Sequence, residues 1–373
     1  MRWRRLAVNV VAGVSALVIA LAISSIALLL IGHDPITAYR EVFNYGNHPG
    51  QIISVINAAV PLYIAALAVA IGFKMGLFNI GVEGQYALAA LFAATAGAHV
   101  HLPWGPLQIL FILLVAMGTG AVWAGVAGVL KVTRGVHEVI STIMLNTIAV
   151  GISAYLFLEH FAQPTSATNL TTQTPFLPKN AAMPALVHSS AKIPEPLTSM
   201  VFIAAILGVL FYVVVWKTKF GYNLRASGTN FEAARVSGID PRAMVVKTML
   251  LSGAIAGLVG MTQILSFSHA YTLDFQVGLG FTGIAVALVG RNNPIGAAVA
   301  ALLFGYLQVS AQILDFNGIP KEVYLIMEGV IILSVVVAYE LARRSLERSE
   351  VRRAAEATRR LAEASEPLAK VEA

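Results

Sequence analysis

The sequence contains no cysteine among its 373 residues. Disulfide bonds, thiolate nucleophiles and cysteine-ligated metal sites are therefore excluded. Charge is scarce as well, because Asp, Glu, Lys and Arg make up 12% of the chain, whereas a soluble domain contains roughly 25%. Hydrophobic residues make up 57%, and the mean hydropathy is +0.76. This composition excludes a soluble globular domain and indicates a protein of the lipid bilayer.

Long apolar runs predict helices that span the membrane. Inside a bilayer every backbone N–H and C=O group must be paired within the protein, which leaves helical bundles and closed β-barrels. Helices cross with runs of about 20 apolar residues, whereas barrel strands alternate over about 10. The sequence therefore predicts an all-α, polytopic helical bundle. About ten transmembrane helices are expected, at residues 6–31, 52–72, 77–100, 107–130, 139–160, 198–216, 245–267, 277–290, 294–314 and 323–341.

Basic residues predict the orientation of these helices. Arg2, Arg4 and Arg5 precede the first apolar run, which places the N-terminus in the cytoplasm by the positive-inside rule. The basic residues that then fall on the cytoplasmic side are Lys74, Lys131, Arg134, Lys217, Lys219, Arg225, Arg235, Arg242, Lys247, Arg291, Arg343, Arg344 and Arg348. Both termini are then cytoplasmic. Because the positive charge is confined to short loops and the tail, it describes membrane topology and not a nucleic-acid surface.

The chain divides into a transmembrane domain at 1–342 and a charged cytoplasmic tail at 343–373. The tail is rich in Ala, Glu and Arg, which favours a solvated helix. Within the domain, a proline-rich loop at 161–197 is expected on the outer side and a basic loop at 217–244 on the cytoplasmic side. The predicted span at 277–290 is short, since it covers only about two thirds of a ~30 Å hydrocarbon core. It is either a full or a broken helix.

The cytoplasmic loop 217–244 carries the signals of a short helix of two or three turns. Asn230 is a good N-cap, and Glu232 lies in the positive first turn. Arg235 lies in the negative last turn, and Gly238 supplies a left-handed stop. So short a helix is marginal in water and needs support from the bundle or from a docked protein. On these residues alone, an ordinary positive-inside loop is the alternative.

The segment 76–86 is unusually polar and glycine-rich for a membrane helix. Asn79, Glu83 and Gln85 are costly against lipid. Two interpretations remain open: a tightly packed segment whose Glu83 makes an interhelical hydrogen bond, or a segment that lines the translocation path. The segment 278–283 weakly repeats its pattern, and paired interrupted helices are typical of transport sites. The candidate path residues are Phe78, Asn79, Glu83, Gln85, Phe281 and Thr282.

Most other polar and glycine residues in the spans are expected to serve packing. Asn146 and Gln263 are expected to make interhelical hydrogen bonds, and Gly253 and Gly257 have the spacing for close helix contact. Glu138 lies at the end of a predicted span, where a solvated carboxylate is expected.

Three segments resemble a known family. The residues that carry the resemblance in the cytoplasmic loop are Gly221, Leu224, Arg225, Ala226, Gly228, Asn230, Ala233, Ala234, Arg235, Gly238 and Ile239. They look like the coupling loop of permeases of ATP-binding-cassette (ABC) importers in the ribose and branched-chain amino-acid superfamily. The run Gly-Leu-Phe-Asn-Ile-Gly-Val-Glu-Gly-Gln at 76–85 is more similar to the nucleoside and simple-sugar permeases of that superfamily. The run at 278–296 resembles the family's late-span signature.

This resemblance implies a multi-pass transport subunit of the bacterial inner membrane that imports a small molecule, a nucleoside or a simple sugar. The residues implied to couple it to an ATPase are Arg225, Gly228, Asn230, Glu232, Ala233, Ala234, Arg235 and Gly238. Further implied partners are a second, homologous permease in a heterodimer, an external substrate-binding lipoprotein and membrane lipid.

The energy source is expected to lie outside this chain. The sequence has no Gly-x-x-x-x-Gly-Lys-[Ser/Thr] loop, so ATP and Mg are expected on the partner ATPase and no cofactor or metal in this chain. No His-Glu-x-x-His motif and no Ser-Lys or Asp-Asp pair at catalytic spacing lies in the spans, so we expect no catalytic residues and no enzyme. Two alternatives remain. One is a ribose or branched-chain amino-acid permease of the same superfamily, and the other is an ion-coupled secondary transporter that uses Glu83.

Overall fold

The computed structural model describes residues 15, 18–163, 171–190, 193, 195–319, 323–335 and 337. The chain forms two compact units. One unit spans Arg40–Asn317, and the other contains the described residues of Met1–Tyr39 and Gly318–Ala373. The predicted cytoplasmic tail at 343–373 and the N-terminal arginines lie outside the described residues.

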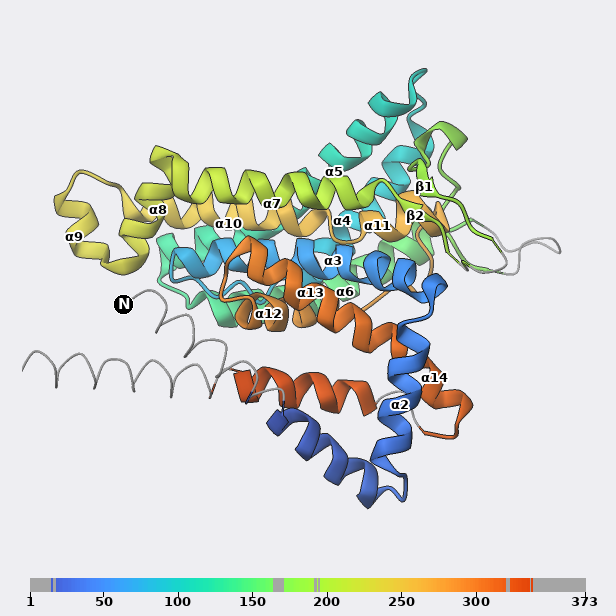
Figure 1. The fold of residues 1–373 in the computed structure, drawn as a ribbon. Coiled ribbons are helices and arrows are strands. Elements are labelled where there is room, and N and C mark those ends of the chain that lie inside the picture. Colours follow the sequence, from blue (N-terminus) through green and yellow to red (C-terminus); the bar gives the residue numbers. More distant parts are fainter. Residues whose placement is uncertain are drawn as a thin grey trace, which may run out of the picture. The chain divides into compact units, whose positions relative to one another are not determined.

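The larger unit is almost entirely helical (Figure 1). Its helices are α3 (Pro49–Lys74), α4 (Val82–His99), α5 (Gly105–Arg134), α6 (Glu138–Leu156), α7 (Met200–Lys217), α8 (Lys219–Thr229), α9 (Phe231–Val236), α10 (Pro241–Gly257), α11 (Met261–Gln263), α12 (Leu279–Val289), α13 (Pro294–Ser310) and α14 (Gln312–Phe316). The π-helical turns η1 (Phe157–Phe161) and η3 (Ile264–Ser268) follow α6 and α11. The predicted loop at 161–197 contains the short 3-10 turn η2 (Lys179–Ala181) and a small antiparallel sheet of β1 (Ala185–Val187) and β2 (Leu197–Thr198).

The sequence encodes where several of these helices start and stop. Pro241 and Pro294 open α10 and α13, where the missing N–H of proline costs nothing. The side chains of Asp240 and Asn293 cap the same two helices by accepting hydrogen bonds from backbone N–H groups in the first turn. Gly135 ends α5 in the left-handed conformation, with φ 68°.

These helices make the chain an all-α, polytopic membrane protein. Among the described residues, six helices are long and apolar enough to cross a membrane, or seven if a bent pair counts as one span. The six are Pro49–Lys74, Gly105–Arg134, Glu138–Phe161, Met200–Lys217, Pro241–Ser268 and Pro294–Phe316. Each of the ten predicted segments contains helix, but Leu279–Val289 and Val323–Val335 are shorter apolar helices. The count of ten and the position of the termini therefore stay predictions.

A helix that the sequence prediction missed, α2 (Pro35–Gly46), follows the apolar helix Val18–Leu30. Asp34 caps α2, because its carboxylate accepts a hydrogen bond from the backbone N–H of Thr37 at 2.9 Å. The Thr37 hydroxyl also donates to this carboxylate and lowers the pKa of Asp34. Gly32, with φ 84°, lies between the two helices, which are bent by 117°. The two helices therefore do not form one straight span.

Helix α3 lies at the centre of the larger unit, where it packs against α7, α10, α12 and α13 (Figure 1). Residues 64–72 of α3 are all buried. Helices α5 and α10 approach each other even more closely, at glycines. A Cβ atom added to Gly253 would lie 2.2 Å from the carbonyl oxygen of Gly120, and one added to Gly257 would lie 2.1 Å from that of Ala116. The predicted close packing at Gly253 and Gly257 is confirmed.

Candidate functional site

Glu83 connects the start of α4 to the start of α12. Its Oε1 atom accepts hydrogen bonds from the backbone N–H of Gly278 at 2.6 Å and from the hydroxyl of Tyr86 at 2.9 Å. Its Oε2 atom accepts a hydrogen bond from the backbone N–H of Gly280 at 2.8 Å. The first N–H groups of a helix lack intrahelical partners and carry partial positive charge, so a carboxylate is favourable there. Glu83 therefore caps a helix that is distant in the sequence.

Two glycines, one just before α12 and one in its first turn, allow this contact. Gly278 has φ 92°, a backbone conformation that favours glycine. Gly280 has no space for a side chain, since an added Cβ atom would lie 2.5 Å from the backbone nitrogen of Glu83. The two weakly similar segments at 76–81 and 278–283 thus lead into helices whose first turns meet.

Asn79 and Gln85 form a buried amide network beside this contact, in which every donor and the acceptor of Asn79 are paired. The Asn79 Nδ2 atom donates to Gln85 Oε1 at 3.1 Å and to Ser252 Oγ at 2.8 Å. The Asn79 Oδ1 atom accepts from Gln85 Nε2 and from the backbone N–H of Gly81, both at 3.0 Å. Ser252 in turn donates to the carbonyl oxygen of Ala68 at 2.6 Å. Asn79 is 0% exposed and Gln85 is 1% exposed, so the network is closed to solvent.

Asn146 of α6 supports the same segment. Its Nδ2 atom donates to the carbonyl oxygen of Ile80 at 3.0 Å, and its Oδ1 atom accepts from the backbone N–H of Gly84 at 2.9 Å. The predicted interhelical hydrogen bonds of Asn146 are confirmed.

The expectation of a solvated Glu138 is wrong. Its side chain is buried, forms an ion pair with Lys131, and accepts a hydrogen bond from the backbone N–H of Phe78 at 3.3 Å. Helix α6 starts at Glu138 just after α5 ends, so the tight connection brings Lys131 and Glu138 together. Sequence spacing alone did not reveal this burial.

The remaining path candidates lie around these networks. Phe78 is half-buried and packs edge-on against Phe73, with ring centroids 4.7 Å apart. Phe281 and Thr282 lie in the first turn of α12, where Phe281 is 52% exposed and Thr282 is half-buried. The structure thus brings Phe78, Asn79, Glu83 and Gln85 into one packed junction with the start of α12.

The predicted coupling helix is present as α9, and it is shorter than expected. It has six residues, which is fewer than two turns. The Asn230 side chain accepts a hydrogen bond from the backbone N–H of Ala233 at 2.9 Å. Gly238 ends the helix with φ 80°. Helix α8 precedes α9 directly, and its Arg225 donates to the carbonyl oxygen of Gly221 at 3.2 Å.

Helix α9 is exposed on nearly all sides. Ala234 is its only buried residue, at 4% exposure. Glu232, Ala233 and Arg235 are exposed, and so is the apolar Val236, at 88%. In Figure 1, α8 and α9 lie at the left end of the larger unit, whereas β1 and β2 lie at the right end.

Gly228 joins α8 to the polar junction. A Cβ atom added to Gly228 would lie 2.6 Å from the carbonyl oxygen of Lys74 and 2.8 Å from the Cα atom of Met75. These residues form the turn between α3 and the segment that contains Asn79. The end of α8 therefore packs on the backbone of Lys74 and Met75. These two residues precede Glu83 by at most nine positions in the sequence.

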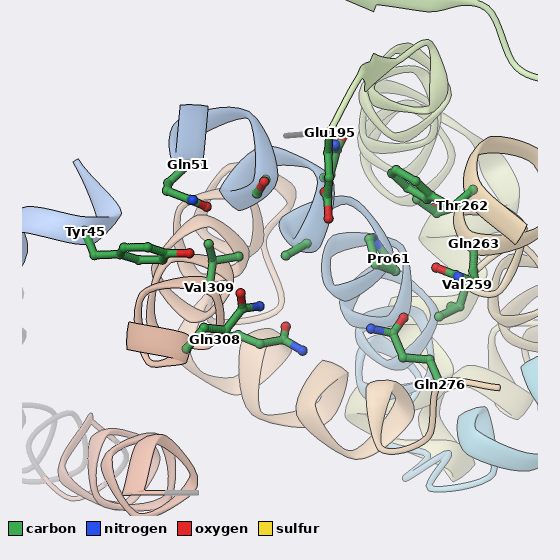
Figure 2. A pocket seen from close by; sticks show the side chains of 15 residues that line it. Tyr45, Gln51, Pro61, Glu195, Val259, Thr262, Gln263, Gln276, Gln308 and Val309 are labelled. Carbon is green, nitrogen blue, oxygen red and sulfur yellow. The ribbon is translucent and has the colours of Figure 1, made fainter. Parts of the chain in front are cut away.

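A polar cavity of about 400 Å³ (Figure 2) lies at α11 and the first half of α3, which are on the right of the larger unit in Figure 1, whereas α9 is on the left. It is lined by the first half of α3, by the segment from the end of α10 to η3, by the end of α13, and by single residues of α2 and of the loops. The polar side chains in its lining are those of Tyr45, Gln51, Ser54, Asn57, Glu195, Thr262, Gln263, Gln276, Gln308 and Gln312. None of the six path candidates is among the described residues that line it.

Sequence reasoning missed this cavity. Gln263 was expected to hydrogen-bond to a neighbouring helix, yet its side chain lines the cavity and makes no hydrogen bond to any other residue that the structure describes. The available signal was the recurrence of glutamine near the ends of apolar spans. Only the fold reveals that these spans meet at the same end.

The comparisons with known proteins agree with this architecture. The family model described as the permease component of branched-chain amino acid transport systems matches residues 51–336 of this chain. The chain is 32% identical over 356 residues to the nucleoside ABC transporter permease protein NupB of Lactococcus lactis subsp. cremoris (strain MG1363), covering 93% of this chain and 96% of that protein. It is also 32% identical to the guanosine ABC transporter permease protein NupP of Bacillus subtilis (strain 168), covering 87% and 92%. It is 31% identical to the glucose ABC transporter permease protein TsgB13 of Haloferax volcanii, covering 86% and 85%. No solved structure matches the chain.

The helical membrane fold and these similarities define a transport subunit rather than an enzyme. The chain belongs to the family of permease components named for branched-chain amino acid transport, and it is a permease subunit of an ABC importer. Membership of this family implies an ATPase and a substrate-binding protein as partners.

Proposed function

We propose that this permease moves nucleosides, or else simple sugars, into the cytoplasm of a bacterium across its inner membrane, driven by a separate ATPase subunit. The cargo proposal is supported by relatives that are named as nucleoside, guanosine and glucose permeases. ATP and Mg are bound by the partner, and this chain itself holds no cofactor.

The exposure of α9 is the observation that carries the coupling mechanism. A helix of six residues is unstable alone, so its caps and its attachment to α8 maintain it. It presents Phe231 at 42% and Val236 at 88% exposure, beside the charged Glu232 and Arg235. Apolar side chains displayed on a short, polar-rimmed element indicate a surface for another protein. Helix α9 is therefore the docking element for the ATPase, together with Arg225 and Gly228 of α8.

The proposed topology has ten spans, with both termini in the cytoplasm. Residues 1–342 form the permease domain, and 343–373 form a cytoplasmic tail. Helices α3, α5 and α7 end at Lys74, Arg134 and Lys217, and α8 and α9 follow α7 directly. By the positive-inside rule this end is cytoplasmic, and the cavity then opens toward the external binding protein, a lipoprotein.

A second permease subunit completes the proposed pathway as a heterodimer. Two bacteria each contain two permease proteins that are similar to this chain. The translocation path would then involve Phe78, Asn79, Glu83, Gln85, Phe281 and Thr282 as the packed junction that moves, rather than as side chains already open to water.

An ion-coupled secondary transporter that uses Glu83 is the competing function. It is less well supported, because the carboxylate of Glu83 is already engaged by three donors of α4 and α12. A ribose or branched-chain amino-acid permease would keep the same mechanism and change only the cargo.

Arg235→Glu tests the coupling role. The variant reverses the charge on the docking element, so ATP-driven nucleoside uptake into proteoliposomes is expected to fall by at least tenfold, while the permease still inserts and folds. The matched control is Arg242→Glu, an equally exposed arginine just outside α9, which is expected to keep uptake.

Two results would contradict the proposal. One is normal uptake by Arg235→Glu with normal ATPase co-purification. The other is wild-type uptake that stops with a protonophore and continues without the ATPase, which would establish the ion-coupled alternative.

A further inference from the structure

The cavity gathers most of the glutamines of the chain. The sequence contains nine glutamines, and five of them line this single cavity. They are Gln51 of α3, Gln263 of α11, Gln276 of the loop before α12, Gln308 of α13 and Gln312 of α14. Elements from four separate parts of the chain thus deliver the same chemical group to one place. Amides within a membrane protein are costly unless they are paired, so this concentration needs a physical reason.

These five amides are not used to hold the fold together. Their side chains form no hydrogen bond with any other residue in the part of the chain that the structure describes. Figure 2 shows Gln263, Gln276 and Gln308 entering the lining from different elements. By contrast, Gln85 and Gln108, which lie outside the cavity, are buried and paired with neighbouring groups. The cavity amides are therefore free to bind something else.

The lining is nearly without charge. Nine of the fifteen lining residues carry uncharged hydrogen-bonding side chains, and Glu195 is the one charged residue among the described residues of the lining. No lysine, arginine or histidine belongs to this described lining. A zwitterionic amino acid would bring a carboxylate that finds no cation there, and an unpaired carboxylate is expensive to remove from water. The lining therefore favours a neutral ligand that both donates and accepts hydrogen bonds.

The volume of the cavity and the aromatic side chains in its lining restrict the class of ligand further. The cavity volume of about 400 Å³ falls within the range of small-molecule sites, which is about 300–1,000 Å³. Tyr45 and Phe267 contribute aromatic rings to the lining, and Tyr45 is seen at its edge in Figure 2. Aromatic faces stack on heterocyclic bases, and amides pair with their polar edges.

We propose that this cavity is a binding site within a single permease subunit for the transported molecule, and that the molecule is a nucleoside recognised by the five glutamines. The inference rests on the proposed importer function and adds the residues that contact the cargo. Each amide offers one acceptor and two donors, which suits a ligand with hydroxyl groups and a base.

The cavity is also connected to the Glu83 junction. The Tyr86 hydroxyl lies 2.9 Å from the carbonyl oxygen of Gln276 and 2.9 Å from Oε1 of Glu83, so these two acceptors share its single proton. The backbone that presents Gln276 is thereby fixed to the starts of α4 and α12. Glu83 and Tyr86 are positioning residues for one wall of the site.

The test is direct binding of radiolabelled uridine to the permease–ATPase complex in lipid nanodiscs, without the external binding protein. The variants are Gln263→Met and Gln276→Met, because Met keeps the length of the side chain and removes its hydrogen bonds. Each change is expected to weaken uridine binding about tenfold, the effect of losing one good hydrogen bond. The double variant is expected to lose detectable binding. Gln163→Met, at an exposed glutamine outside the cavity, is the matched control and is expected to bind like the wild type.

Competition experiments define the ligand class. Unlabelled guanosine is expected to displace uridine, whereas leucine is not. Equal displacement by leucine, tighter binding of glucose than of uridine, wild-type binding by the double variant, or no uridine binding by the wild type would each overturn the proposal. These outcomes are separate from failure of the importer function, which would appear as ATP-independent uptake in proteoliposomes while the binding assay still reports on the cavity.

Discussion

Two clusters of side-chain amides in this permease have opposite properties. The Asn79 cluster is closed to solvent, and every donor and acceptor of the Asn79 amide has a protein partner. The glutamine cavity is open, and its five amides have no hydrogen-bond partner among the described residues. Both clusters cost free energy to place in a membrane protein. The difference is what our proposal predicts if the first cluster stabilises the fold and the second binds the cargo.

The two clusters predict opposite effects of mutation on stability. Removing a paired polar group should destabilise the protein, because its partners lose their hydrogen bonds in a buried place. Removing an unpaired one should leave stability unchanged and should affect only ligand binding. Unfolding in mixed detergent micelles provides the measurement, and the changes below run from the largest expected effect to the smallest.

Glu83→Leu should have the largest effect. It leaves the N–H groups of Gly278 and Gly280 without their acceptor and removes one of the two acceptors of the Tyr86 hydroxyl, so the free energy of unfolding should fall by about 3 kcal/mol. The control is Glu159→Leu, at an exposed glutamate of η1, which should change stability little. A Glu83→Leu protein as stable as the wild type would contradict the capping role.

Asn79→Leu should come next, with a loss of about 2 kcal/mol, since hydrogen bonds between membrane helices contribute less than their number suggests. Its partners Gln85 and Ser252 remain buried in the variant. Asn44→Leu changes an exposed asparagine of α2 and is the reference. Equal stabilities for the two variants would show that the closed network does not support the fold.

Gly280→Ala should cost less, about 1.5 kcal/mol, because it adds one methyl group where the backbone of Glu83 already fills the space. Gly151→Ala has open space around the added methyl group and should be neutral or slightly stabilising. If the two alanine variants unfold together, α4 and α12 do not meet as closely as described.

Gln308→Met should have the smallest effect on unfolding, a change within about 0.5 kcal/mol, because Gln308 makes no hydrogen bond to any residue that the structure describes. Its effect should appear in the affinity for nucleoside instead. A destabilisation equal to that of Asn79→Leu would remove the distinction between the two clusters.

The sequence was sufficient to predict the helices and much of the coupling loop. Apolar runs identified the segments that contain helix, and Asn230 and Gly238 act as the cap and stop that were expected. These signals depend on residues that are close together in the sequence, so they act in the same way in the folded protein. Helix α2 was missed because it is short and its turn signals resemble those of a loop.

The partners of the polar residues could not be predicted in the same way. The sequence left open whether Glu83 makes a packing contact or lines a path, because two of its three partners lie at the start of α12, almost 200 residues further along the chain. Burial of Glu138 and convergence of the five glutamines depend likewise on how the helices pack. The sequence alone shows that placing such residues in a membrane costs free energy, but it does not identify the hydrogen-bond partner that offsets this cost.

The single carboxylate between α4 and α12 makes their contact all-or-none. Both backbone bonds to the start of α12 end on Glu83, and the Tyr86 hydroxyl lies between the same carboxylate and the loop that presents Gln276, sharing its one proton between them. A small shift of α12 would strain both backbone bonds at once, because they end on the same side chain. Two discrete arrangements are therefore favoured over a gradual deformation. A displacement of α8 at Gly228 would then change the wall of the cargo cavity only after both bonds to Glu83 break.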